Sequence, residues 1–258
     1  MVEEIIRKDD GYVAILTINR PDRRNALNAD ALFGIGDMLT DLKKDDNIRA
    51  LVIQGAGEKV FSSGVDLSAA GQSVERTMEG LEYCLNSLID YPYPIIAMIQ
   101  GAAIGAGLDI SVISDFRIAS EKAKFGATLV KLGRIYYYTA IKRLMDLVGL
   151  MAAKEILLTG RLIEAKRAME LGLINQIVPH DELSNTTYSF ARELAEENAP
   201  ISMRATKMTI HKLLEHRKLD DQLESELKAL AEEANSSEDG VEGVMAMLEK
   251  RKPNFKGK

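Results

Sequence analysis

The sequence is poor in the residues that build disulfides and metal sites, with one cysteine and three histidines among 258 residues. A single cysteine, Cys84, cannot form an internal disulfide, and it fits a reducing compartment. Three histidines and one cysteine offer no zinc cluster, so we expect no metal. No run of about twenty apolar residues is present to span a membrane. Residues 1–8 lack the apolar core of a signal peptide, so we expect a cytoplasmic protein.

Charge is unevenly distributed along the chain. The net charge is −6, yet the last nine residues, Lys250–Lys258, hold five lysines and arginines and no acid, which leaves −11 on the rest. An acidic body disfavours nucleic-acid binding. The basic end is suited to contact a phosphate, with a solvated terminus as the alternative. With 46% apolar residues, the chain is long enough for one large domain, or a domain with an appendage.

The first half of the chain alternates between extended and helical patterns. Asn28 is a suitable N-cap for a helix with an apolar stripe, and Pro92 and Pro94 end a helix near Asp90. Strands are predicted at 12–18, 50–53, 95–99, 116–119 and 124–126. Beyond residue 182 the strand patterns stop, and helices are predicted at 183–197, 201–215, 219–234 and 239–249. The repeating unit is therefore strand, turn and helix, followed by a helical region.

Two glycine-bearing turns, Phe61–Asp66 and Gly101–Asp109, carry the strongest functional signal. Each lies between a predicted strand and a predicted helix, and is built largely from small residues. Such a turn leaves backbone N–H groups accessible, and two of them can converge on one oxygen anion. Tight packing of helix on sheet is the structural alternative for Gly105 and Gly107. The pattern favours chemistry at a polarised carbonyl.

Taken together, four segments resemble the crotonase superfamily, which contains the enoyl-CoA hydratases and isomerases. Residues 19–28 look like its opening coenzyme A segment, 61–67 and 101–110 like its two oxyanion loops, and 249–255 like its C-terminus. The resemblance implies an α/β fold, in which residues 1–195 form a spiral of ββα units that binds acyl-CoA. Residues 196–258 would form a helical trimerisation region, giving a homotrimer or a homohexamer.

The resemblance also implies a site. The backbone N–H groups of Val65 and Ala106 would hold the thioester oxygen, and losing one such donor typically slows a reaction about 10²–10³-fold. No cofactor is required, because coenzyme A is part of the acyl-CoA substrate. Residues 71–81 would border the acyl pocket, although Met78, Leu81 and Leu85 fit helix packing equally well. The expected coenzyme contacts are Arg24, Ala26, Leu27, Asp66, Leu67, Lys252 and Phe255, the last two supplied either by the same chain or by a neighbouring subunit.

The pattern departs from the hydratases of this superfamily at their two catalytic glutamates, which align with Asp109 and Leu129. Leucine cannot carry a proton, and aspartate is one methylene shorter than glutamate. Because each general acid or base contributes about 10²–10⁴-fold, efficient standard hydration is not expected. Tyr136 and Tyr137 are candidate replacements, at positions resembling a tyrosine of methylmalonyl-CoA decarboxylases and an aspartate of dienoyl-CoA isomerases. Aromatic packing is the alternative for both.

Three reactions fit these residues, and we expect enoyl-CoA hydratase/isomerase-type chemistry in the broad sense, with double-bond isomerisation favoured over standard hydration. In double-bond isomerisation, which the aspartate favours, Asp109 shuttles a proton beside the apolar Leu129. In decarboxylation of a malonyl-type thioester, the oxyanion hole does most of the work and Tyr136 orients the leaving carboxylate. In hydration or thioester hydrolysis of an unusual substrate, Asp109 orients water. A non-catalytic acyl-CoA-binding subunit is the alternative from a different class, and an RNA-binding role is disfavoured by the acidic body.

Overall fold

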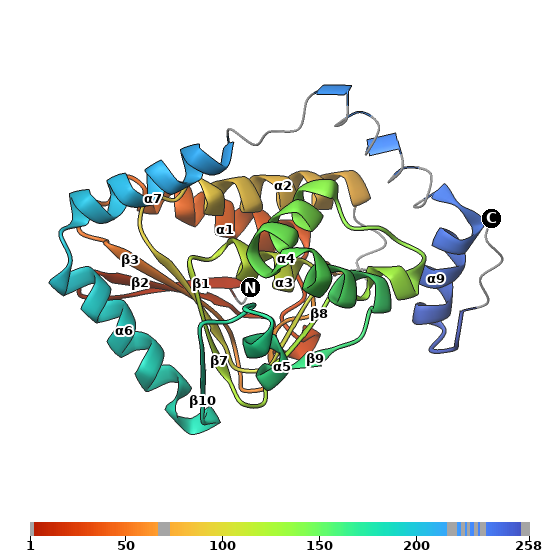
Figure 1. Cartoon of the computed structure of the whole chain (residues 1–258), viewed down its shortest axis with the longest axis horizontal. Coiled ribbons are helices and arrows are strands. Elements are labelled where there is room, and N and C mark those ends of the chain that lie inside the picture. The colour runs from red at the N-terminus through yellow and green to blue at the C-terminus, as the bar shows by residue number, and fades with distance from the viewer. Residues whose placement is uncertain are drawn as a thin grey trace.

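Two β-sheets form the core of the computed structural model, which describes residues 3–66, 73–215, 221–222, 225, 228–229, 232 and 236–253 (Figure 1). The larger sheet has the strand order β1-β2-β3-β5-β7-β10, and the smaller has the order β4-β6-β8-β9. The strands of the larger sheet are β1 (Ile5–Asp10), β2 (Val13–Ile18), β3 (Ala50–Gly55), β5 (Ile95–Ile99), β7 (Phe116–Ser120) and β10 (Gln176–Val178). Those of the smaller sheet are β4 (Val60–Ser62), β6 (Ala102–Ile104), β8 (Lys124–Gly126) and β9 (Ile163–Glu164).

The chain places one strand in each sheet before it enters the next helical segment. Strands β3 and β4 precede α2 (Val74–Ile89), and β5 and β6 precede α3 (Ala106–Ile113). Strands β7 and β8 precede a short 3₁₀ helix, η2 (Thr128–Leu132), and α4 (Tyr138–Thr159), which is interrupted at Gly149. Equivalent strands pair in parallel: β3 with β5 and β5 with β7 in the larger sheet, and β4 with β6 and β6 with β8 in the smaller. This arrangement confirms the predicted spiral of ββα units.

The central strands β2, β3 and β5 of the larger sheet are buried on both faces, which explains why they are apolar. Along β2, Leu16 and Ile18 belong to the main core beneath α1 (Ala29–Leu42) and α2. Val13 and Ile15, which alternate with them, belong to a second cluster beneath α6 (Leu183–Glu197). A parallel sheet covered by helices on both sides is expected to carry such near-continuous apolar strands. Figure 1 shows α1 and α2 together on one side of the sheet and α6 on the other.

The remaining helices complete the described part of the chain. Two of them are α7 (Pro200–Glu215), whose ribbon lies near those of α1 and α2 in Figure 1, and α9 (Glu238–Leu248), at the opposite end of that view. Helix α9 packs against η2, where a methyl group on Gly243 would overlap the backbone of Leu132. The short elements are η1 (Pro21–Arg23), α5 (Ala165–Glu170) and η3 (His180–Glu182). Within the described ranges, no helix combines the length and apolar character needed to cross a membrane.

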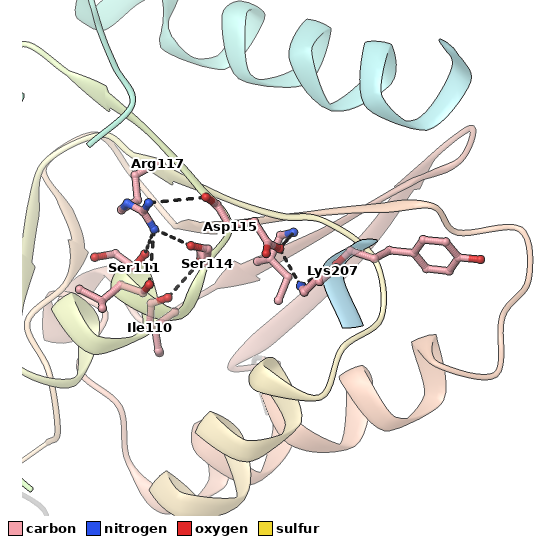
Figure 2. Close-up of polar contacts among 9 residues, drawn as sticks. Ile110, Ser111, Ser114, Asp115, Arg117 and Lys207 are labelled. Atoms are coloured by element: carbon pink, nitrogen blue, oxygen red, sulfur yellow. Dashed lines mark hydrogen bonds and ion pairs between the residues drawn. The ribbon is translucent and has the colours of Figure 1, made fainter. Parts of the chain in front are cut away.

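A buried arginine closes the C-terminal end of α3, the short central helix (Figure 2). Nη1 of Arg117 donates hydrogen bonds to the carbonyl oxygens of Ser111, at 3.1 Å, and of Ser114. A cation at this end of a helix satisfies the last carbonyls and complements the negative end of the helix dipole. Burial lowers the pKa of Arg117 to about 10, so the contact is made by a group largely withdrawn from water.

Just beyond the end of α3, an ion pair links the helix to α7 (Figure 2). Nζ of Lys207 lies 2.6 Å from Oδ2 of Asp115 and donates to the carbonyl oxygen of Tyr93 at 2.9 Å. The same carboxylate oxygen accepts from the backbone N–H of Ile95 at 2.7 Å. One carboxylate therefore ties the start of β5, the end of α3 and the helical region together.

The structure confirms most of the predicted elements and adds some that the sequence did not reveal. Strand β5 and helix α6 have the predicted bounds, and Asn28 caps α1 by accepting the N–H of Ala31 at 2.8 Å. The strands not predicted are β1, β4, β6, β9 and β10. Most of the helix predicted at 219–234 lies outside the described residues.

Candidate active site

The two predicted glycine turns touch each other in the structure. Gly64 has φ = +92°, and a methyl group on its Cα would lie 2.9 Å from the carbonyl oxygen of Ile104 and 3.2 Å from the nitrogen of Ala106. Any side chain would therefore be strained and would push the turns apart. The close approach of these turns depends on glycine at position 64.

The two amides assigned to the oxyanion hole lie on these touching turns. Val65 forms an isolated parallel bridge with Leu27, but the two hydrogen bonds of this bridge are made by the residues on either side of Val65. The N–H of Leu27 donates to the Gly64 oxygen at 2.8 Å, and the N–H of Asp66 donates to the Leu27 oxygen at 2.9 Å. The N–H of Val65 consequently faces away from Leu27. Ala106 is the first residue of α3, so its N–H has no partner within the helix. Neither N–H is hydrogen-bonded to another residue in the described part of the chain.

Helix α3 adds an electrostatic contribution at the same place. It begins at Ala106 after Gly105, whose φ of +59° and ψ of −125° let the chain leave β6 and enter the helix abruptly. The N-terminus of a helix carries a partial positive charge and unpaired N–H groups, which together favour an anion. The arrangement can therefore stabilise negative charge on an oxygen placed before Ala106.

Asp109, the predicted acid–base residue, is held by an arginine that the sequence did not single out. Nε of Arg143, on α4, donates to Oδ1 of Asp109 at 3.1 Å, and Nη2 donates to Oδ1 at 2.9 Å and Oδ2 at 2.7 Å. The carboxylate is 8% exposed and the guanidinium 23%. Burial raises the pKa of Asp109, and the facing Arg143 offsets part of that rise. A forked pair of this kind is among the stronger hydrogen-bonded contacts in proteins.

The two candidate tyrosines have different surroundings. Tyr136 packs against the main core, and its buried Oη has no hydrogen-bond partner among the described residues. A methyl group on Gly105 would lie 3.8 Å from that oxygen, so the hydroxyl is beside the second glycine turn. Burial raises the pKa of Tyr136, and the charge of Asp109 adds to this rise, so the group stays protonated as a hydrogen-bond donor. Tyr137 is 50% exposed at the start of α4.

The predicted coenzyme segment is joined directly to the first glycine turn. The carbonyl oxygen of Arg24 accepts the N–H of Ser63 at 3.1 Å, and Leu27 is bonded to Gly64 and Asp66 as described above. The exposed Arg24 and the buried Asn25 both have positive φ, at 55° and 53°. Asn25 fixes this conformation through Nδ2, which donates to the carbonyl oxygens of Ala56 at 2.9 Å and Val60 at 2.7 Å. The segment and the turn thus form one hydrogen-bonded unit.

The remaining predicted residues are placed as follows. Ala26 and Leu27 are buried, and the backbone N–H and carbonyl groups of both are hydrogen-bonded within the chain. The carboxylate of Asp66 is paired with Arg20 at 3.1 Å, a contact that the sequence did not suggest. Lys252 is exposed, while Leu67 and Phe255 lie outside the described residues.

The acyl pocket expected along residues 71–81 is only partly described. Residues 71 and 72 lie outside the described ranges. Leu81 and Leu85 are buried in the main core, and Met78 packs against it, which supports the helix-packing interpretation of these three residues. Leu129 is half-buried on η2. Among the described residues, no three histidine, cysteine, aspartate or glutamate side chains are grouped to hold a metal.

One sequence signal could have revealed Arg143. The buried side of α4 includes Ala140 and Leu144, and Leu147 packs partly against the core. Positions 140, 143, 144 and 147 share one helical face. A lone arginine on an apolar face must find a buried acceptor, because an unpaired charge there is costly. The sequence did not, however, identify which carboxylate it would meet.

An α/β spiral with paired glycine turns at a helix N-terminus is the architecture predicted for an acyl-CoA enzyme of the crotonase type. The family model described as enoyl-CoA hydratase/isomerase matches residues 8–258. The chain belongs to this family.

Two curated relatives and one solved structure illustrate the family likeness. Short-chain-enoyl-CoA hydratase of Clostridium acetobutylicum is 34% identical over 97% of both chains. A putative enoyl-CoA hydratase of Thermus thermophilus is also 34% identical, over 97% of this chain and 100% of the relative. A methylmalonyl-CoA decarboxylase in complex with 2-nitronate-propionyl-CoA has a TM-score of 0.91 and 29% identity, covering 99% of both chains. Relatives within the family thus include both hydratases and a decarboxylase.

Proposed function

We propose that the protein is an enolate-forming acyl-CoA enzyme that decarboxylates a malonyl-type thioester. The N–H groups of Val65 and Ala106 would hold the thioester oxygen, with the start of α3 adding its positive end. Support comes from the contact between the two turns and from the unpaired state of both N–H groups among the described residues. Preorganised donors of this kind stabilise the developing negative charge without rearranging during the reaction.

The observation that carries the choice of reaction is the ion pair between Asp109 and Arg143. Three hydrogen bonds from the guanidinium occupy both oxygens of this carboxylate. Isomerisation and hydration each need Asp109 to move a proton or to position water, and the pairing opposes both. Decarboxylation needs no base, because breaking the bond between Cα and the carboxylate leaves the electron pair that becomes the enolate. A proton from solvent then completes the product at Cα.

Tyr136 is assigned the role of hydrogen-bond donor to the departing carboxylate. Its Oη is buried beside Gly105 and has no partner within the described structure, so a substrate oxygen would satisfy it. The apolar Leu129, where hydratases of this family are expected to have a glutamate, favours departure of the neutral CO₂. The similar fold of the methylmalonyl-CoA decarboxylase supports this assignment.

Double-bond isomerisation, with Asp109 as the proton carrier, is the second candidate. The names of the curated relatives, which denote enoyl-CoA hydratases, support chemistry on an unsaturated acyl chain. This reaction requires Arg143 to release one carboxylate oxygen when substrate binds. No cofactor beyond the coenzyme A of the substrate enters either scheme.

Product analysis by mass spectrometry separates the candidates. Purified protein would be incubated with malonyl-CoA, methylmalonyl-CoA, crotonyl-CoA, a 3-enoyl-CoA and a dienoyl-CoA. We expect loss of CO₂ from a malonyl-type thioester, with one deuterium gained at Cα in D₂O. Gain of water or migration of a double bond, without CO₂ loss, would overturn the proposal. Binding without turnover of any of the five substrates would favour a non-catalytic acyl-CoA-binding subunit.

Adjacent tyrosines provide a matched pair of variants for this assay. Tyr136→Phe removes the buried hydroxyl, and we expect kcat to fall by about 10²-fold, the typical effect of one well-placed donor. Tyr137→Phe removes a hydroxyl from the half-exposed neighbour and should leave kcat within about twofold, because surface substitutions usually have small effects. Equal effects of the two substitutions would contradict the role given to Tyr136.

We also propose the remaining expectations for coenzyme binding and assembly. The coenzyme would be contacted by Arg24, Leu67, Lys252 and Phe255. The core domain would end near residue 195, and residues 196–258 would form the contacts between the subunits of a trimer. The apolar side chains exposed on α7 support this assembly: Ile201, Met208, Ile210 and Leu214. Light scattering tests it directly, and a monomer at micromolar concentration would contradict it.

A further inference from the structure

The pair formed by Asp109 and Arg143 carries no net charge, and this affects which substrates the site can accept. Asp109 lies one turn after Gly105 on α3 and donates its N–H to the Gly105 oxygen at 3.1 Å. Residues four apart share a helix face, and side chains lean toward the helix N-terminus. The carboxylate of Asp109 is therefore directed toward the turn that supplies the oxyanion amide and that lies beside Tyr136. Its charge acts where the acyl group would bind.

We propose that Arg143 is a specificity-determining residue that cancels the charge of Asp109, so that the site accepts an acyl-CoA carrying a free carboxylate. This inference rests on the proposed function, and it identifies the substrate class as monothioesters of short dicarboxylic acids. Arg143 acts through Asp109, as a positioning residue, rather than by taking part in bond breaking.

Electrostatics gives the reason for this neutralisation. A free substrate carboxylate and the enolate that follows it are both negative, so an unopposed Asp109 would repel each of them. At an effective dielectric constant of about 20 and a separation of about 6 Å, two like charges repel by about 3 kcal/mol. That energy corresponds to roughly a hundredfold in affinity. A neutral ion pair removes most of this penalty.

The placement of Arg143 is consistent with this role. Its guanidinium reaches Asp109 from the apolar face of α4 through a fork of hydrogen bonds, whereas Lys142 beside it pairs with Asp146 at the more exposed side of the same helix. An arginine fork neutralises both carboxylate oxygens and holds their orientation. The two neighbouring cations on one helix thus provide a test residue and its control.

Calorimetric titration with two coenzyme A thioethers measures the effect without turnover. 2-Carboxypropyl-CoA bears a carboxylate, and S-isobutyl-CoA has a methyl group in its place. The quantity of interest is the ratio of their dissociation constants, in which the charge of the coenzyme cancels. For Arg143→Met we expect the carboxylate ligand to be disfavoured by roughly ten- to a hundredfold relative to the wild-type ratio.

Neutralising Asp109 instead of Arg143 distinguishes this role from a structural one. Asp109→Asn leaves Arg143 unopposed and should shift the ratio in the other direction, toward the carboxylate ligand. The double variant Asp109→Asn, Arg143→Met restores neutrality and should return the ratio to within about threefold of wild type. Lys142→Met, which removes the same charge from α4, should leave the ratio unchanged. S-isobutyl-CoA binding and thermal unfolding confirm that each variant is folded.

Two outcomes would overturn the inference. If Arg143→Met and Asp109→Asn shift the ratio in the same direction, or if neither shifts it, the pair does not set substrate charge. Failure of the proposed function has a different signature, because wild-type protein would then release no CO₂ in the turnover assay. The titration ratios would still report on charge selection in that case. If Arg143→Met does not fold, Arg143→Gln in the same titrations provides the test.

Discussion

Each end of α3 has a carboxylate that faces a cation from a later helix, and the two pairs are organised differently. Asp109, in the first half of the helix, is 2.7 Å from Arg143, and Asp115, just after the helix, is 2.6 Å from Lys207. In the first pair the carboxylate is the more buried partner, at 8% exposed against 23%. In the second the ammonium is, at 8% against 24%.

The groups around the two pairs differ more than the pairs themselves. Asp115 and Lys207 also bond to the backbone of Ile95 and Tyr93, so each charge has additional partners. Beside Asp109, the hydroxyl of Tyr136 and the N–H of Ala106 have no partner among the described residues. Buried polar groups are normally satisfied, and exceptions call for an explanation. The unpaired donors, rather than the ion pair, therefore distinguish the end of α3 for which we propose ligand binding.

The largest effect is expected where the two glycine turns meet. Gly64→Ala places a methyl group 2.9 Å from the Ile104 oxygen and 3.2 Å from the Ala106 nitrogen, and must separate the turns. We expect kcat/KM to fall by about 10²–10³-fold, the typical loss for one oxyanion donor. The measurement is steady-state kinetics on the substrate that the turnover assay identifies.

Gly57→Ala is the control for this substitution. Gly57 also has positive φ, at +77°, but a methyl group there comes no closer than 3.9 Å to Pro21. It should cost about 1 kcal/mol of stability through backbone strain and leave kcat/KM unchanged. Equal losses of activity in the two variants would show that backbone strain, rather than the oxyanion geometry, is responsible.

An intermediate effect, on stability rather than activity, is expected at the other end of α3. Lys207→Met leaves the Asp115 carboxylate without its cation, and breaking a largely buried pair costs about 3 kcal/mol of unfolding free energy. Urea unfolding measures this loss. Lys142→Met breaks an exposed pair on α4 and should cost less than about 1 kcal/mol. A change of substrate selection in Lys207→Met would remove the distinction between the two ends of α3.

The smallest effect is a pH dependence of the unfolding free energy that arises from Asp109, at the N-terminal end of α3. Arg143 from α4 acts on Asp109, and the charge of Asp109 in turn raises the pKa of Tyr136 and, on α2, of Cys84. Burial raises the folded-state pKa of Asp109 above its ordinary value of 3.8. Its contribution to stability is therefore complete below that value and is lost as the pH rises through the folded pKa.

Urea unfolding at a series of pH values tests this sign. The unfolding free energy of wild type minus that of Asp109→Asn should fall as the pH rises from about 4 toward the folded pKa. A difference that rises over this range would mean that Arg143 outweighs burial and lowers the pKa of Asp109.

Local patterns in the sequence predicted much of the fold. The N-cap at Asn28 and the apolar runs of β2, β3 and β5 depend on neighbours in the sequence, and the structure confirms them. Strands β4 and β6 were not predicted because they overlap residues 61–66 and 101–109, which the sequence analysis assigned to glycine turns. Their position is set by pairing with other strands of the smaller sheet, and no local pattern in the sequence indicates this pairing.

The site was predicted as far as its chemistry depends on turns. The glycine turns were identified because small residues between strand and helix have few other uses, and the structure brings them into contact. Arg143 was missed because its role depends on how α4 packs against α3, across 34 residues of sequence. The same holds for Arg20, whose partner Asp66 belongs to a different loop.

The hydrogen bonds between the coenzyme segment and the first glycine turn fix the position of one relative to the other. Because Arg24, Leu27 and Asn25 are bonded to the strand and turn at Val60–Gly64, the two pieces of backbone are expected to move as one body. A coenzyme held by this segment would then place its thioester at a constant position relative to the N–H of Val65. Differences between substrates would then be accommodated on the acyl side of the carbonyl, beyond this hydrogen-bonded unit.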